Sequence, residues 1–153
     1  MPTRLDAQLL AGAPDDTLQA LGLTRTGPYR LLGNGQHPFA RVGAAAADGA
    51  DATTEGEGVR VELASEFEAT SAAMAALHVG GDEALRLLAG LLHLGSLTFE
   101  DATATDSAAA GSNLRASAVA PASAEALQHA SALLGMPTLA SLLTKRSVQA
   151  GGG

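Results

Sequence analysis

Histidines are the side chains of this sequence best suited to acid–base chemistry or metal binding, and there are four of them. They are His37, His78, His93 and His129. They are scattered along the chain, and no two of them have the His-x-x-x-His spacing of a metal site. His93 lies in the most apolar stretch, where a histidine hydrogen-bonded to a neighbouring group is the expected arrangement. We therefore predict a core histidine and no metal site.

Other residue types that carry chemistry lack the motifs that would organise them. The sequence has no cysteine, so it has no disulfide, thiol nucleophile or zinc–thiolate site. No Gly-x-Ser-x-Gly elbow and no Gly-x-x-x-x-Gly-Lys-Ser/Thr phosphate loop occurs. The short run Gly33-Asn34-Gly35 is typical of a plain turn. By its own residues, this chain predicts no catalytic site and no bound cofactor.

Composition predicts a helical chain and argues against several classes of partner. The 153 residues are enough for one domain, and they are 46% hydrophobic but only 3% aromatic. A core made of leucine and alanine favours helices. The net charge of −7 argues against nucleic-acid binding. The longest apolar run is interrupted by Arg86 and His93 and is too short to span a membrane.

The most apolar stretch, Asp82 to Phe99, is the predicted centre of the fold. Asp82 can cap a helix and Gly95 can end it in the left-handed conformation. Leucines point in almost every direction around residues 82–94, so we expect this helix to be the most buried one. Residues 97–99 then predict a short strand. The predicted core residues are Leu85, Leu88, Leu91, Leu92 and Phe99.

The remaining predicted helices are short and are bounded by glycine or proline. They cover residues 5–11, 17–21, 66–79, 123–134 and 137–143. Ser65 and Glu68 have the spacing of a capping box, which starts the third of these helices. This helix is amphipathic and a tight link joins it to the central helix, so we expect the two to form an antiparallel pair.

Two low-complexity stretches, 43–58 and 101–122, are predicted to be flexible loops. Both are rich in Ala, Gly, Ser, Thr and acidic residues, and neither has an apolar period. A weak alternation over 115–119 within the second stretch could pair with the strand at 97–99. The predicted fold class is therefore mostly α, with at most a short β-ribbon near 97–99.

Three blocks of the sequence resemble the myosin motor head, and they occur in that family's order. The first is Glu66 to Thr70 with Ala73-Met74, and the second is Leu88 to Phe99. The third is Leu133-Leu134-Gly135 followed by Leu142-Leu143-Thr144-x-Arg146-x-Val148-x-x-Gly151. Ser96 stands where the family usually has Asn, and the two low-complexity stretches match nothing.

The resemblance implies that residues 1–153 are part of a myosin motor domain, a P-loop NTPase that acts as an actin-activated ATPase. The chain would lie in the upper half of the actin-binding cleft, between the two nucleotide switches. The phosphate loop and both switches would then lie outside it, so the chain alone is expected to be inactive and to hold no Mg-ATP, which the whole head would bind. The implied location is the cytoplasm, in the cytoskeleton.

Lys145 and Arg146 are the candidate actin-binding residues. They form an adjacent basic pair in an acidic chain, in a segment that resembles the start of a surface loop with which myosin heads touch actin. The simpler interpretation is a cation at a helix C-terminus. A free-standing helical module for protein–protein interaction remains the alternative for the whole chain. We expect a helix near Leu5 whose beginning is missing and a chain interrupted at the glycines that end at Gly153, and both favour a fragment over that module.

Overall fold

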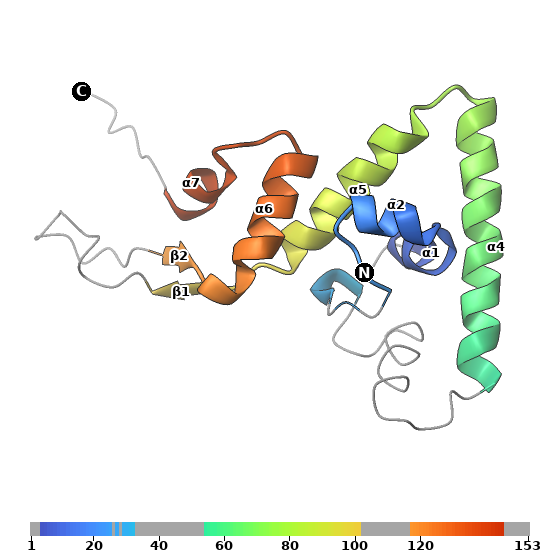
Figure 1. Ribbon diagram of the computed structural model, residues 1–153, viewed down its shortest axis with the longest axis horizontal. Coiled ribbons are helices and arrows are strands. Elements are labelled where there is room, and N and C mark those ends of the chain that lie inside the picture. The colour runs from blue at the N-terminus through green and yellow to red at the C-terminus, as the bar shows by residue number, and fades with distance from the viewer. Residues whose placement is uncertain (1–3, 26, 28, 33–53, 102–116, 146–153) are drawn as a thin grey trace, which may run out of the picture.

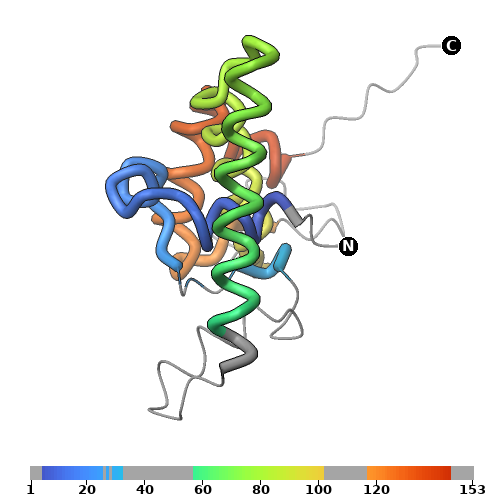
Figure 2. The backbone as a smooth tube through the Cα atoms, turned by 90° about the vertical axis from the view of Figure 1, so that its right-hand side faces the viewer, coloured from blue at the N-terminus to red at the C-terminus, as the bar shows by residue number. Residues whose placement is uncertain are grey.

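The computed structural model describes residues 4–25, 27, 29–32, 54–101 and 117–145, and these are mostly helical. The long helices α4 (Thr54–Ala76) and α5 (Gly81–Gly95) meet at one end and diverge like the arms of a V (Figure 1). Between the arms lie α1 (Arg4–Gly12) and α2 (Asp15–Ala20). On the other side of α5 lie α6 (Ala124–Leu133) and α7 (Leu139–Thr144). Figure 2 views the same arrangement from the side, with α4 in front.

The most buried helix among the described residues is α1, not the predicted central helix. Leu9 and Leu10 of α1 are fully buried, because this helix contacts both α4 and α5. In α5, by contrast, Leu87 is 55% exposed and Leu91 is 42% exposed. The prediction that residues 82–94 form the most buried helix is wrong, since α5 presents one of its faces to solvent.

The predicted core residues fall into three groups. Leu92 is fully buried, and Leu85 and Leu88 are half-buried against the core. The prediction is wrong for Leu91, which is on the solvent face of α5, and for Phe99, which is 49% exposed. Phe99 lies in the β-ribbon, which extends beyond the end of α6 and away from α1 and α4 (Figure 1).

Helix α4 is longer than predicted and packs on a different partner. It begins at Thr54, so Ser65 and Glu68 lie mid-helix and form no capping box. Residues 54–58 therefore belong to α4 and not to the predicted loop 43–58, of which residues 43–53 lie outside the described part of the chain. The helix packs mainly on α1, not on α5 as predicted. Only tertiary structure shows that α1 occupies the space between them.

Hydrogen bonds and a close backbone approach fix the α1–α4 contact. Gln8 Nε2 donates to Glu66 Oε2 at 2.8 Å, and the Thr70 hydroxyl donates to Gln8 Oε1 at 3.2 Å. A Cβ placed on Gly12 would lie 2.5 Å from Phe67 Cβ. The absent side chain at Gly12 therefore lets the two helices approach closely, and the buried polar atoms of Gln8 are paired.

The α4–α5 connection and the caps of α5 differ from the prediction. Helix α4 ends at Ala76 and not at Gly80-Gly81, and Gly80, not Asp82, occupies the N-cap of α5. Ser96 at the C-cap of α5 has right-handed backbone angles, and Gly95 does not have a positive φ. Gly95 therefore does not end the helix in the left-handed conformation. Gly95 instead allows a close approach, because a Cβ there would meet the side chain of Leu31.

His78 provides the left-handed residue that ends α4, with φ of 54°. The Val79 N–H donates to Met74 O at 2.9 Å, and the His78 N–H donates to Ala75 O at 3.1 Å. This is the pattern of a helix end that normally has glycine. We expect His78→Gly to stabilise the protein by about 0.5–1 kcal/mol, because glycine adopts this φ without steric cost. Chemical unfolding followed by circular dichroism measures the change.

His78→Ala is the matched control for this prediction. It removes the same exposed imidazole but keeps the Cβ that disfavours positive φ. We expect no gain in stability from alanine, and equal stabilities of the glycine and alanine variants would contradict the proposed role of φ.

The described strands form the predicted β-ribbon, displaced by two residues. Strand β1 (Phe99–Asp101) pairs with β2 (Ser117–Val119) in an antiparallel register that aligns Phe99 with Val119. The ends of the predicted loop 101–122 are thus ordered, in β1, β2 and the 3-10 turn η2 (Pro121–Ser123), and residues 102–116 lie outside the described part. Ser123 occupies the N-cap of α6, but its hydroxyl accepts from the Thr98 N–H at 3.0 Å and makes no capping hydrogen bond to that helix.

Candidate functional site

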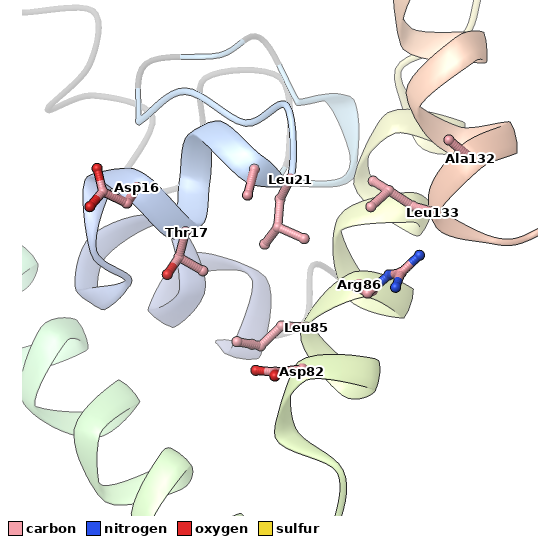
Figure 3. A pocket seen from close by; sticks show the side chains of 9 residues that line it. Asp16, Thr17, Leu21, Asp82, Leu85, Arg86, Ala132 and Leu133 are labelled. Atoms are coloured by element: carbon pink, nitrogen blue, oxygen red, sulfur yellow. The ribbon is translucent and has the colours of Figure 1, made fainter.

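A groove lies between α2, α5 and α6 (Figure 3). Its volume is about 670 Å³. Leu21, Leu85 and Leu133 give it an apolar lining, while the exposed side chains of Asp16, Asp82 and Arg86 lie around it (Figure 3). In the described residues, no group of three or more His, Cys, Asp or Glu side chains could hold a metal ion. The groove is suited to apolar contact and contains no arrangement of a nucleophile with a base.

Two histidines from different helices stack on one another. The rings of His93 (α5) and His129 (α6) have centroids 4.8 Å apart and an interplanar angle of 20°. His93 is 5% exposed, and its Nε2 lies 3.0 Å from the Leu21 carbonyl oxygen. Since a carbonyl oxygen only accepts, Nε2 carries the proton and donates it. This confirms the prediction that His93 is a hydrogen-bonded core histidine.

The segment after α2 completes the surroundings of the stack. The Tyr29 ring meets His93 edge-on, with centroids 6.5 Å apart at 83°. The Tyr29 hydroxyl accepts a hydrogen bond from the Thr24 N–H at 2.8 Å. Gly22 lies against His129, because a Cβ on Gly22 would be 2.5 Å from the ring atom Cε1. The stack therefore joins three segments that are distant in sequence.

Burial sets the protonation of His93. Desolvation lowers the pKa of His93 below its ordinary value of 6.5, and the nearby His129 lowers it further. The hydrogen bond to Leu21 and the charge of Glu125 raise the pKa but do not cancel the burial effect. His93 is consequently neutral at neutral pH. Because its ring is buried and hydrogen-bonded to the Leu21 carbonyl, it is not available as a nucleophile.

The predicted actin-binding pair is described only in part. Lys145 is exposed, at the C-cap of α7, where its N–H donates to Ser141 O at 3.0 Å. Its position at the helix end agrees with a favourable interaction with the helix dipole. Arg146 lies outside the described residues, as does the turn at 33–35. The structure therefore places neither of them relative to the groove.

Two features were missed from the sequence. The first is the His93–His129 stack, for which the sequence has no local signal, because the two residues lie on different helices. The second is Arg25, whose guanidinium donates to the carbonyl oxygens of Leu10, Ala11 and Ala13 at 2.7–2.8 Å. No pattern in the sequence indicates these three contacts, because their acceptors are backbone atoms.

Comparisons with known proteins leave the function to be argued from the chain itself. No protein-family model matches the sequence, and no curated protein matches it either. In the described part of the chain, no helix is long and apolar enough to cross a membrane.

Proposed function

We propose that this chain is part of the head of an actin-based, ATP-driven motor of the myosin type, within the region that forms the actin-binding cleft. The observation that carries the proposal is the sequence resemblance in three consecutive blocks. These blocks correspond to the middle of α4, to the end of α5 with β1, and to the end of α6 with α7. A mostly helical fold with a short ribbon after α5 agrees with the resemblance.

The proposed role is mechanical and not catalytic for this part of the head. The described residues offer the apolar groove and the histidine stack, and neither presents phosphate-binding donors with a lysine or arginine aimed at them. Mg-ATP would be bound by other parts of the motor. In this proposal the chain acts in the cytoplasm, on actin filaments, through the segment that begins at Lys145.

A helical module for protein–protein interaction is the second candidate function. The observation that favours it is the exposed apolar face of α5, where Leu87 and Leu91 follow one another at a spacing of four. Such a face is typical of a helix that packs against something else. The two candidates differ in the neighbouring coding sequence and in actin binding.

The reading frame upstream of Met1 gives the first test. A motor head requires a Gly-x-x-x-x-Gly-Lys-Ser/Thr phosphate loop encoded in the same frame. Sequencing the transcript at its 5′ side detects it. An in-frame stop codon shortly before Met1, with no alternative splice joining an upstream exon, would contradict the motor proposal and leave the interaction module.

Actin co-sedimentation of the whole chain gives the second test, with Arg146→Glu as the variant. We expect the unchanged chain to pellet with actin filaments at low ionic strength and less at high ionic strength. Arg146→Glu should lower the affinity roughly two- to tenfold at low salt, because a basic segment interacts favourably with an acidic filament surface.

The matched control is Arg60→Glu, which makes the same charge change on an exposed position of α4. Its affinity for actin should equal that of the unchanged chain. Equal losses for Arg60→Glu and Arg146→Glu would reduce the effect to net charge. Equal binding by all three proteins at every salt concentration would remove Arg146 from the actin contact.

A further inference from the structure

The His93–His129 stack is one of the contacts that hold α6 against the rest of the core. It brings together α5, α6 and the turn after α2, since His93 donates to Leu21 O and His129 packs on Gly22. The rings are nearly parallel, so each presents its face to the other. This geometry is favourable for uncharged aromatic rings in offset contact. Two positively charged rings in the same place would repel one another in a partly buried site.

The charged groups near His93 do little to offset such repulsion. Titratable side chains that act on its ring in the described residues are His129 and Glu125 from α6 and Tyr29 from the segment before α4. Glu125 is 3.8 Å from His129, but its side chain is 89% exposed, so solvent screens it. The Tyr29 hydroxyl accepts a hydrogen bond from the Thr24 N–H and is directed away from the two imidazole rings' contact.

The direction of the pH effect follows from the burial of His93. Its pKa in the folded protein is below the value of 6.5 that an unfolded or opened chain would show. Between these two pKa values the opened state binds more protons, so acid favours it. Stability is therefore fully present above pH 6.5, and is lost as the pH falls from 6.5 to the pKa of the folded state.

We propose that the His93–His129 stack is an acid-sensitive latch, which holds α6 on α5 and on the Leu21–Gly22 turn at neutral pH and releases α6 in acid. Opening would separate the Leu133–Leu134 end of α6 from α5, where Gly90 now lies against Leu134. The part released would be α6 with α7, while α1 and α4 keep their own contact. This inference does not depend on the assignment to a motor head.

Hydrogen exchange of the whole chain, followed by mass spectrometry, tests the latch directly. Exchange is compared at about pH 7.5 and about pH 5.5, one unit either side of the ordinary histidine pKa, after correction for the intrinsic pH dependence of exchange. We expect the protection of α6 amides to fall more than that of α4 amides, by up to about tenfold, which is the limit set by a pH one unit below the ordinary histidine pKa. Helix α4 is the internal control, because it packs on α1. Equal changes in α4 and α6 would overturn the proposal.

His129→Phe is the variant that separates charge from packing. It keeps a flat ring against His93 but removes the second charge of the stack, so the acid response of α6 should be smaller than in the unchanged protein, and the part that remains comes from the burial of His93. His78→Gln removes an exposed histidine at the end of α4 and should leave the acid response unchanged. A full acid response in His129→Phe, or its loss in His78→Gln, would overturn the latch.

A titration of the unchanged protein keeps the test valid if His129→Phe does not fold. The Cε1–H resonance of His93 in the NMR spectrum reports its protonation. It should titrate below pH 6.5, and the loss of α6 protection should begin at a higher pH and be complete once the ring has titrated. A His93 ring that becomes protonated while α6 stays fully protected would contradict the latch.

Discussion

Gly22→Ala is expected to destabilise the protein by about 2–5 kcal/mol, which is a large share of the total stability of a domain of this size. Two costs add at this position. Gly22 has φ of +66°, where a Cβ costs about 1–2 kcal/mol. The new Cβ would also lie 2.5 Å from His129 Cε1, and forcing such contacts costs about 1–3 kcal/mol. Urea unfolding followed by circular dichroism at neutral pH measures the loss.

Gly135→Ala separates the cost of the backbone conformation from the cost of the steric contact with His129. Gly135 also has φ of +66°, but a Cβ there would meet nothing within 4 Å. We expect it to lose only about 1–2 kcal/mol, the cost of the backbone conformation. The difference between the two variants then measures the packing of His129 on the turn. Equal losses would mean that α6 moves away from Gly22 without cost, and would contradict a tight contact at this point.

Arg25→Ala is expected to cost about 2–4 kcal/mol. The Arg25 side chain, 32% exposed, lies at the end of α1 and satisfies carbonyl oxygens that have no partner within the helix. Hydrogen bonds from a charged donor are among the stronger ones, and their loss leaves partly buried acceptors unpaired. Arg25→Lys should recover less than half of the loss, because an ammonium group lacks the planar fork that reaches several carbonyls at once. Urea unfolding measures both variants.

Asp15→Asn separates the ion pair of Arg25 from its backbone contacts. Asp15 Oδ1 is 2.8 Å from Arg25 Nη2, but the Asp15 side chain is 88% exposed. Removing its charge should cost less than about 1 kcal/mol, as for other exposed ion pairs. If Asp15→Asn were as destabilising as Arg25→Ala, the ion pair and not the contact with α1 would account for the effect.

Local sequence signals predicted the elements with clear boundaries. Leucine spacing and Gly12 predicted α1, and glycine at 22 and 135 predicted the ends of α2 and α6. The start of α4 was missed, because Thr54 to Gly58 has the composition of a loop and helix formation there depends on continuation from the following turns. The end of α4 was missed because His78, and not a glycine, adopts the left-handed conformation.

Of the candidate site, only the buried, hydrogen-bonded state of His93 could be predicted from the sequence. His93 in an apolar helix predicted a hydrogen-bonded core histidine, but its partner Leu21 O is 72 residues away. The stack with His129 required the position of α6 on α5, and the groove required the positions of α2, α5 and α6 together. Leu91 was predicted to be buried because its helix is apolar on nearly every side, yet burial depends on what covers each side.

The sequence by itself determined that this protein is acidic and free of cysteine chemistry, because both follow directly from its composition. It also determined that the protein is mostly helical, because apolar periodicity and helix propensity depend on residues that are near one another in the chain. It also carried the resemblance on which the motor proposal rests. Tertiary structure alone decided that α1 and not α5 is the most buried helix, that Arg25 binds the end of α1, and that His93 and His129 stack. These contacts join residues far apart in the chain, and their free energy depends on distances of a few ångströms that no local pattern specifies.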